Sequence, residues 1–218
     1  MVLEEYKDLV ATAAGITTVA QCFSPIFMCK KIVQSGTSKG TDPMPFIGGM
    51  ALAVLFLKYG LILNDPAMIP VNIFAFALNF GYTICYYVYS TETSQLFSAL
   101  GKATALVAVL LGYTQWEAQE HVEFRFGLIV TVLMLGLIGS PLLSLKEIIR
   151  TKSTESLPFP LIASGTVVTL LWLLYGIIID NVFMKVQNVI ALILSVVQLS
   201  LFVIYPSSPP KKQEKKKN

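Results

Sequence analysis

The chain has 218 residues, of which 55% are hydrophobic and only 13% are charged, and its mean hydropathy is +0.68. A soluble domain carries about 25% charged residues, so this composition argues against a soluble enzyme and indicates a protein that faces lipid. The formal net charge is +3, but five basic residues lie in the last eight positions, namely Lys211, Lys212, Lys215, Lys216 and Lys217. A folded nucleic-acid-binding surface is therefore not expected.

Seven segments have the roughly 20 mostly apolar residues that a membrane-spanning helix needs. They are Leu9–Cys29, Met44–Leu63, Ala67–Tyr89, Leu96–Tyr113, Phe126–Leu145, Pro158–Ile179 and Val182–Tyr205. The first follows acidic residues, whereas a cleavable signal peptide begins with positive charge, so we expect it to stay as a helix. The sequence thus predicts an all-α membrane protein with seven spans, short connections and a disordered tail from Pro206.

Basic residues predict how these spans are oriented, because Lys and Arg accumulate on the cytosolic side of a membrane. With seven spans, the connections 30–43, 90–95 and 146–157 share one side with the tail. That side, helix edges included, holds twelve of the sixteen Lys and Arg residues. We therefore expect a cytosolic C-terminus and an N-terminus that is outside or lumenal. The 114–125 segment, predicted as an outer loop, is acidic.

An internal repeat appears when the chain is shifted by 116 residues. The shift places Ser24-Pro25 on Ser140-Pro141 and Tyr59-Gly60 on Tyr175-Gly176. Further matches are Lys30 with Lys146, Met68 with Met184, Asn72 with Asn188 and Tyr89 with Tyr205. Matched leucines are common between apolar helices, but paired Ser-Pro units and intramembrane asparagines at one constant offset are not.

The repeat unit contains three helices, so the first to third spans match the fifth to seventh. The offset includes four spans, an even number, so both units run in the same direction and the fourth helix is an unpaired linker. The predicted layout is 3+1+3, two parallel three-helix bundles joined by a linker helix. The predicted boundaries are 1–90 for the first repeat, 91–122 for the linker helix and outer loop, 123–206 for the second repeat, and 207–218 for a basic cytosolic tail.

Asn72 and Asn188 are the polar pair that the repeat places opposite each other. A primary amide in hydrocarbon needs partners for its donors and acceptor, so each side chain is expected to point to a cavity or a neighbouring helix. An amide pair suits a neutral polyol, whose hydroxyls donate and accept. Hydrogen bonding between helices is the other interpretation, and the residues alone leave both open.

Phe56 and Trp172 are equivalent at the same offset, and their aromatic faces could stack on the C–H face of a sugar ring. Prolines occur in or at the start of four paired helices, where a proline removes a backbone hydrogen bond; they are Pro25, Pro45, Pro141 and Pro158. Pro45 and Pro158 also suit the ordinary first-turn position of a helix.

Catalytic and coupling residues are missing from the sequence. We find no Ser-His-Asp set, carboxylate pair or nucleotide-binding loop, and none of the thirteen acidic residues falls near the middle of a predicted span. We therefore expect no enzyme activity, no cofactor, no metal site and no coupling to an ion gradient.

Together, the Ser-Pro-x5-Ile unit, the ESLPFP stretch at 155–160, the W-x-x-Y-G unit at 172–176 and the paired asparagines resemble the SWEET sugar transporters, particularly the insect branch. The resemblance covers about 17–206. It implies that Asn72 and Asn188 bind the sugar and that Trp172 and Phe56 form the pocket walls.

The same resemblance implies a proline tetrad of Pro25, Pro45, Pro141 and Pro158 that lets the cytosolic half flex. Tyr59 matches a tyrosine of the family's extracellular gate. The family's gate aspartate falls at Asn181, and the neighbouring Asp180 is taken as the gate carboxylate. Phe56 stands where plant members often have a smaller residue, which favours a monosaccharide.

The resulting hypothesis is facilitative, bidirectional transport of a sugar such as glucose across a lipid bilayer by alternating access. A seven-helix receptor is the alternative from another class, but it would not be expected to carry a three-helix duplication. Transporters of cationic amino acids should carry paired Pro-Gln motifs, whereas Pro25 and Pro141 are followed by Ile26 and Leu142.

Location and assembly stay open at this point. Lys215 and Lys216 resemble a dilysine retrieval signal, which would hold some of the protein in the endoplasmic reticulum or Golgi. The alternative is a polybasic tail that touches anionic lipid, as at the plasma membrane. The family resemblance also allows a homo-oligomer.

Overall fold

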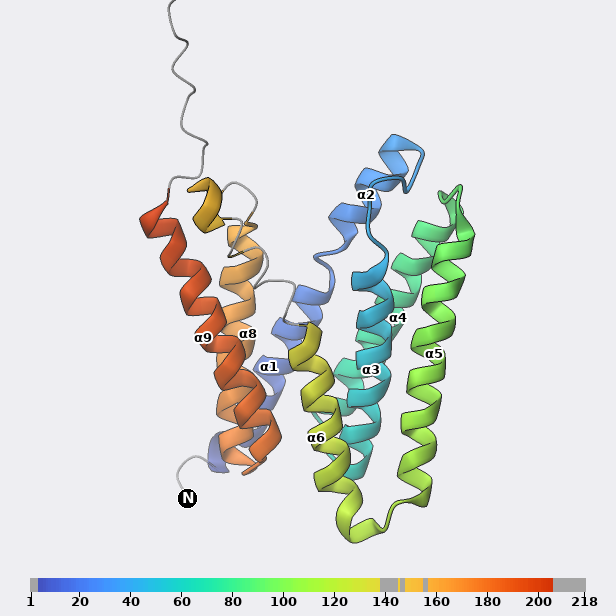
Figure 1. Ribbon diagram of the computed structural model, residues 1–218. Coiled ribbons are helices and arrows are strands. Elements are labelled where there is room, and N and C mark those ends of the chain that lie inside the picture. The colour runs from blue at the N-terminus through green and yellow to red at the C-terminus, as the bar shows by residue number, and fades with distance from the viewer. Residues whose placement is uncertain (1–3, 138–144, 146–147, 155–156, 206–218) are drawn as a thin grey trace, which may run out of the picture.

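Long helices make up most of the computed structural model, which describes residues 4–137, 145, 148–154 and 157–205 (Figure 1). A short 3-10 helix at Glu4–Tyr6 leads into the chain, and no β-strand occurs in these ranges. The α-helices are α1 (Lys7–Cys22), α2 (Ile26–Ser35), α3 (Met44–Leu63), α4 (Met68–Val88), α5 (Thr93–Trp116), α6 (Gln119–Leu137), α8 (Phe159–Ile178) and α9 (Val182–Ile204).

Six helical segments of the described chain are long and apolar enough to cross a membrane. They are Glu4–Ser35, in which α1 and α2 count as one segment, and the helices α3, α4, α5, α8 and α9. Each coincides with a predicted span. The predicted fifth span overlaps α6, and its residues 138–144 lie outside the described ranges. The fold is therefore an all-helical membrane fold, as the composition indicated.

The first predicted span is interrupted at Pro25. Helix α1 ends at Cys22, residues 23–25 form a turn, and α2 begins at Ile26 in a new direction (Figure 1). Proline lacks a backbone N–H, so it suits the position just before or at the start of a helix and breaks one that runs through it. Pro43 and Pro45 likewise flank the start of α3, and Pro158 and Pro160 flank the start of α8.

The predicted outer loop at 114–125 is mostly helical instead. Helix α5 continues to Trp116 and α6 begins at Gln119, so only two residues connect them. Hydropathy marks the part of a helix in hydrocarbon rather than its end, and an acidic first turn stabilises a helix N-terminus. Glu117 stabilises the short connection, because its carboxylate accepts hydrogen bonds from the Tyr113 hydroxyl and from Arg125, the latter at 2.8 Å.

Two equivalent connections, 64–67 and 179–181, join α3 to α4 and α8 to α9. Asn64 and Asp180 have positive φ angles of 52° and 54°, which Asn and Asp tolerate better than most residues. The next residue caps the following helix: Asp65 accepts from the backbone N–H groups of Ala67 and Met68, and Asn181 accepts from that of Met184. We call this end of the molecule the Asp65 end and the opposite end the proline end.

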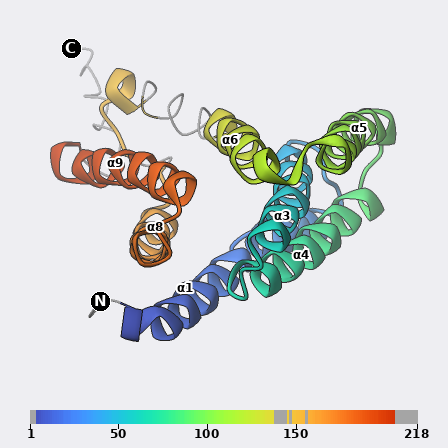
Figure 2. The same cartoon turned by 90° about the horizontal axis from the view of Figure 1, so that it is seen from below.

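Two groups of helices face each other across the molecule. Helix α3 packs closely on α4, and α8 packs on α9, while α1 contacts α8 and α3 contacts α6 across the centre. Figure 2 shows α8 and α9 on one side, α3, α4 and α5 on the other, and α1 and α6 between them. We refer to α1–α4 as the first half and to α6, α8 and α9 as the second half.

The buried core differs between the two ends. At the Asp65 end one cluster joins both halves, with Leu55, Tyr59, Phe126, Tyr175 and Met184 among its members. At the proline end the buried residues form two separate clusters. The first half contributes Cys29, Phe46 and Tyr82 to one, and the second half contributes Ile148, Leu157 and Leu201 to the other. Among the described residues, the halves thus share one buried core at the Asp65 end and have separate buried clusters at the proline end.

Candidate functional site

A central cavity of about 150 Å³ lies between the two halves beside the shared core. Its lining consists of Tyr59 and five pairs of residues that are 116 positions apart. The pairs are Thr18 and Met134, Phe56 and Trp172, Met68 and Met184, Val71 and Gln187, and Asn72 and Asn188. None of these side chains is charged, so the cavity offers neutral polar groups between apolar and aromatic walls. The two asparagines and two aromatic residues that the sequence singled out all line it.

Asn72 and Asn188 have the same local geometry. The Nδ2 group of each donates a hydrogen bond of 2.8 Å to the backbone carbonyl four residues earlier, Met68 in one case and Met184 in the other. An amide has two N–H donors and a carbonyl acceptor. One N–H and the Oδ1 atom of each side chain therefore have no hydrogen-bond partner within the described chain, and these groups are available to a ligand.

Asn79 shows that this backbone bond alone does not mark a site. Its Nδ2 also donates a 2.8 Å hydrogen bond four residues back, to Ala75. Asn79 packs against Gly49, because a Cβ placed on that glycine would stand 2.6 Å from the Asn79 Oδ1 atom. It does not line the cavity. The position beside the cavity is what distinguishes Asn72 and Asn188.

The aromatic walls are held in place differently in the two halves. The Trp172 indole Nε1 donates a 2.8 Å hydrogen bond to Thr18 Oγ1, which links α8 to α1. Its ring also makes an edge contact with Tyr175, with centroids 5.7 Å apart. Phe56 lacks such a donor and is held by packing against the shared core. A bound ring would therefore meet one wall fixed by hydrogen bonding and one fixed by packing.

Two tyrosine contacts join the two halves at the Asp65 end. The Asn181 Nδ2 group donates to the Tyr59 hydroxyl at 3.0 Å, and the Tyr175 hydroxyl lies 3.1 Å from both carboxylate oxygens of Asp65. Both tyrosines are almost fully buried. The contacts are related by the repeat offset, since Tyr59 corresponds to Tyr175 and Asp65 to Asn181. Each one ties the first half to the second.

Asp180 does not take part in these contacts. Its side chain is 90% exposed and pairs with Lys185 at 2.5 Å. The hydrogen bond and charge of Lys185 hold the pKa of the Asp180 carboxyl below its usual value. The physical reason lies in the turn: the residue with positive φ points away from the helix that follows, while the next residue caps it. The structure therefore brings Asn181, rather than Asp180, to Tyr59.

A larger hollow of about 960 Å³ lies at the proline end. It is bordered by the turn between α1 and α2 and by the starts of α3 and α8, and Pro25, Pro45 and Pro158 all line it. Pro141 lies outside the described residues. Three of the four predicted prolines therefore surround one opening, in the region where the two halves have separate cores.

Several residues at the site were not singled out from the sequence. They are Thr18, Asp65, Thr131, Tyr175 and Gln187, which line the cavity or contact a residue that lines it or closes it. For two of them, Tyr175 and Asp65, the repeat offset was the available signal. Applied to Tyr59 it gives Tyr175, and applied to Asn181 it gives Asp65.

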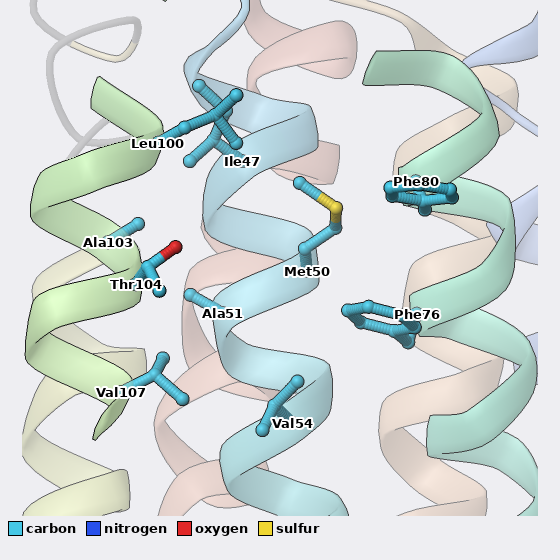
Figure 3. A pocket seen from close by; sticks show the side chains of 10 residues that line it. All are labelled: Ile47, Met50, Ala51, Val54, Phe76, Phe80, Leu100, Ala103, Thr104 and Val107. Atoms are coloured by element: carbon cyan, nitrogen blue, oxygen red, sulfur yellow. The ribbon is translucent and has the colours of Figure 1, made fainter. Parts of the chain in front are cut away.

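Another hollow, of about 330 Å³, lies between α3, α4 and α5 (Figure 3). Its lining is hydrocarbon and aromatic, including Met50, Phe76 and Phe80, and the Thr104 hydroxyl is its polar group. Such a surface suits lipid chains rather than a hydroxyl-rich ligand.

Comparison with known proteins extends this description. The profile of a family described as "Sugar efflux transporter for intercellular exchange" matches residues 8–94 and again residues 124–210. The sugar transporter SWEET1 of Drosophila pseudoobscura pseudoobscura is 35% identical over 91% of this chain and 89% of its own length. SWEET1 of Caenorhabditis elegans is 28% identical over 94% of this chain and 67% of its own length.

A solved structure of a eukaryotic SWEET transporter has the same fold, with a TM-score of 0.87 and 21% sequence identity. It covers 95% of this chain and 100% of its own. These matches place the chain in a class of integral membrane sugar transporters, which are not enzymes. The chain belongs to the SWEET family of sugar transporters.

Proposed function

We propose that this protein carries a neutral monosaccharide such as glucose across a membrane, down its gradient and in either direction. The observation that carries this proposal is the central cavity, which is lined by residue pairs from both halves and lies between a closed Asp65 end and a hollow proline end. The names of the relatives support the choice of a sugar, since each of those compared is a sugar transporter.

The chemistry of the cavity supports a neutral polyol. Two amides with open donor and acceptor groups match hydroxyls, which both donate and accept. Phe56 and Trp172 supply aromatic faces for the apolar side of a sugar ring. The cavity, at about 150 Å³, is smaller than the roughly 300–1,000 Å³ of typical drug-sized ligand sites, which favours one sugar ring over two.

Alternating access follows as part of the proposal. The two halves would act as three-helix bundles, with α5 as the linker of a 3+1+3 layout and repeats within residues 1–90 and 123–206. The two matches to the family profile support this division, because they begin 116 residues apart and leave most of α5 outside. The two halves would rock about the cavity, with the prolines as hinges.

In this cycle the tyrosine contacts form the gate at the Asp65 end. Tyr59–Asn181 and Tyr175–Asp65 would break as that end opens, while the hollow beside Pro25, Pro45 and Pro158 closes. The proposal assigns Tyr59 to the gate, as the family resemblance implied, and replaces Asp180 by Asn181.

Uncoupled transport is favoured by the position of the one buried carboxylate among the gate residues. Asp65 lies at a helix end, where its carboxylate accepts hydrogen bonds from two backbone N–H groups and from the Tyr175 hydroxyl. These contacts account for the carboxylate as a helix cap and a gate contact, without a role in binding a coupling ion. The membrane could be the plasma membrane or the Golgi membrane, with the Asp65 end outside or lumenal and the C-terminus cytosolic. The lysine-rich tail and any homo-oligomer contact remain predictions, and the tail lies outside the described residues.

The test is uptake of labelled glucose into proteoliposomes that contain the purified protein. The native chain should take up glucose without an ion gradient and should be unaffected by a protonophore. Asn72→Ala and Asn188→Ala should each lower uptake by roughly tenfold or more, because each loses hydrogen bonds to the sugar.

Asn79→Ala is the matched control, since it removes an amide with the same backbone bond from the same helix as Asn72 but away from the cavity. Its uptake should stay near the native level. Equal uptake by all three variants would reduce the paired asparagines to a packing role. Loss of uptake with a protonophore would contradict uncoupled transport, and a native chain that carries no sugar would overturn the proposal.

A further inference from the structure

Gln187 is a buried amide at the central cavity that the paired asparagines do not explain. It precedes Asn188 on α9, lines the cavity and is only 4% exposed. Its Nε2 group donates a hydrogen bond of 2.6 Å to Thr131 Oγ1 on α6. A buried amide is costly in hydrocarbon unless its polar groups find partners, so the direction of each group matters.

The hydrogen-bond network fixes which way the Gln187 amide points. The Thr131 hydroxyl has one proton, and it donates that proton to the Gly127 carbonyl at 2.7 Å. Thr131 Oγ1 must therefore accept from Gln187, which places the Nε2 group toward α6. The Oε1 atom faces the other way.

That Oε1 atom is an open acceptor. No hydrogen bond to it occurs within the described chain, whose fully buried side-chain nitrogen and oxygen atoms all have partners. The atom must therefore border open space. Gln187 lines the central cavity, so this space is where a substrate would sit.

The corresponding place in the first half is apolar. At the repeat offset, Thr131 corresponds to Gly15 and Gln187 to Val71. A Cβ placed on Gly15 would stand 3.4 Å from the Val71 Cγ2 atom, an ordinary van der Waals contact. The two positions therefore differ together between the halves. The second half has the hydrogen-bonded pair Thr131 and Gln187, whereas the first half has Gly15 in close apolar contact with Val71.

We infer that Gln187 is a third substrate-binding amide, and that Thr131 is the positioning residue that aims its Oε1 atom into the cavity. This inference rests on the proposed function. Gln187 and Asn188 make the α9 side of the cavity richer in acceptors than the α4 side, where Val71 stands beside Asn72. The site therefore selects a sugar orientation in which a hydroxyl donates toward α9.

A simple link between α6 and α9 is the competing explanation. A link would use the Nε2–Thr131 bond alone, so its loss would weaken the protein without regard to the hydroxyls of the sugar. A substrate contact predicts instead that, once Gln187 is replaced, removing one particular hydroxyl of the sugar no longer raises the KM. Sugars that lack single hydroxyls separate the two explanations, as a double-mutant cycle does for two side chains.

The experiment measures the KM for uptake of glucose and of its 2-, 3-, 4- and 6-deoxy analogues into proteoliposomes. The variants are Gln187→Val, which copies the first half, Gln187→Met, which keeps the side-chain length, and Thr131→Val. Gln187→Val and Gln187→Met should raise the KM for glucose by roughly 5- to 10-fold, the typical worth of one neutral hydrogen bond.

For the native protein, one deoxy analogue should already have a KM that is higher than that of glucose by a similar factor. The KM for that analogue should not rise further in the Gln187 variants. Thr131→Val should shift the same analogue pattern to a smaller extent, because the amide is present but no longer aimed. A KM for glucose that stays native, or one that rises equally for all five sugars, would overturn the inference while leaving the proposed function intact.

Folding failure is checked by size-exclusion elution of each variant, and Gln187→Met guards against a packing defect at the valine. If only Thr131→Val folds, the analogue pattern of that variant decides the question. A native protein that carries none of the five sugars would overturn the proposed function, and this inference would fall with it.

Discussion

The two halves of the molecule place the same residue types in the same positions at some sites and different ones at others. Asn72 and Asn188 make identical 2.8 Å backbone bonds, and Tyr59 and Tyr175 both close the Asp65 end. Asp65 stands opposite Asn181 in the repeat, and Val71 opposite Gln187. In the proposed function, the shared residues would supply what a neutral polyol site between two rocking halves requires. The differing residues supply asymmetry, both in how the gate is held and in how a substrate is oriented.

The gate contacts should differ most in strength, because one involves a carboxylate and the other a neutral amide. Hydrogen bonds to charged groups contribute about 1.5–3 kcal/mol and neutral ones about 0.5–1.5 kcal/mol. Tyr175→Phe should therefore raise the equilibrium population in which the Asp65 end is open by roughly tenfold to a hundredfold. Tyr59→Phe should raise that population by roughly two- to tenfold.

The measurement is the rate at which a membrane-impermeant thiol reagent, added at the Asp65 end of oriented vesicles, labels Met134→Cys in the cavity. The background protein carries serine at Cys22, Cys29 and Cys85, which are its three cysteines. Equal labelling rates in the two tyrosine variants would show that the charge of Asp65 adds nothing to the gate.

Packing around the gate also differs between the halves, at Gly127 and its counterpart Ala11. A Cβ on Gly127 would stand 2.7 Å from the Phe183 ring and 2.9 Å from the Tyr59 hydroxyl. Gly127→Ala should destabilise the protein by about 1–3 kcal/mol through overpacking, and lower the Tm in detergent by roughly 3–10 °C.

Gly112→Ala is the control for that substitution, since a Cβ there would meet nothing within 4 Å. Its Tm should stay at or slightly above the native value, because alanine favours the helix more than glycine does. A Gly127→Ala protein as stable as the control would mean that the α6 and α9 backbones separate easily at the gate.

Asn181→Asp tests whether the asymmetry of the gate can be removed. The new carboxylate could still cap α9 through Met184, and it could accept from the Tyr59 hydroxyl as Asp65 accepts from Tyr175. Charge-assisted hydrogen bonds are about twice as strong as neutral ones, so thiol labelling from the Asp65 end should slow by roughly fivefold. Faster labelling would show that the cost of burying a second charge exceeds the gain of the new bond.

Much of the fold was predictable, because length and hydropathy identify helices that cross lipid. The starts of α3 and α8 were marked by Pro45 and Pro158. The end of α5 and the start of α6 were not predicted, because Glu117, Glu120 and Arg125 reduce hydropathy without ending a helix. Hydropathy reports where a helix leaves hydrocarbon, and hydrogen bonding decides where it stops.

The residues predicted to bind the sugar are repeat pairs that are polar or aromatic in both halves, and the structure places all four beside the cavity. They are Asn72, Asn188, Phe56 and Trp172. Gln187 was missed because its counterpart is the apolar Val71. The direction in which its amide points depends on a hydrogen bond to another helix, which the sequence does not reveal. Asp180 is the predicted gate carboxylate because it neighbours the position of the family's gate aspartate, but its side chain is exposed and Asn181 contacts Tyr59.

Asp180→Asn is the substitution with the smallest expected effect, and it copies Asn64 of the first half. The Asp180 carboxyl is exposed and paired with Lys185, and an exposed ion pair contributes little. Because Lys185 holds the pKa of Asp180 below its ordinary value of 3.8, the pair stabilises the protein above about pH 4 and loses that effect as the pH falls further. Glucose uptake at neutral pH should stay within roughly twofold of native.

Asn181→Ala should instead speed thiol labelling at the Asp65 end, because it removes both the Tyr59 contact and the cap of α9. If Asp180→Asn opened that end while Asn181→Ala did not, the gate would depend on the exposed carboxylate, and the buried amide would be only a helix cap.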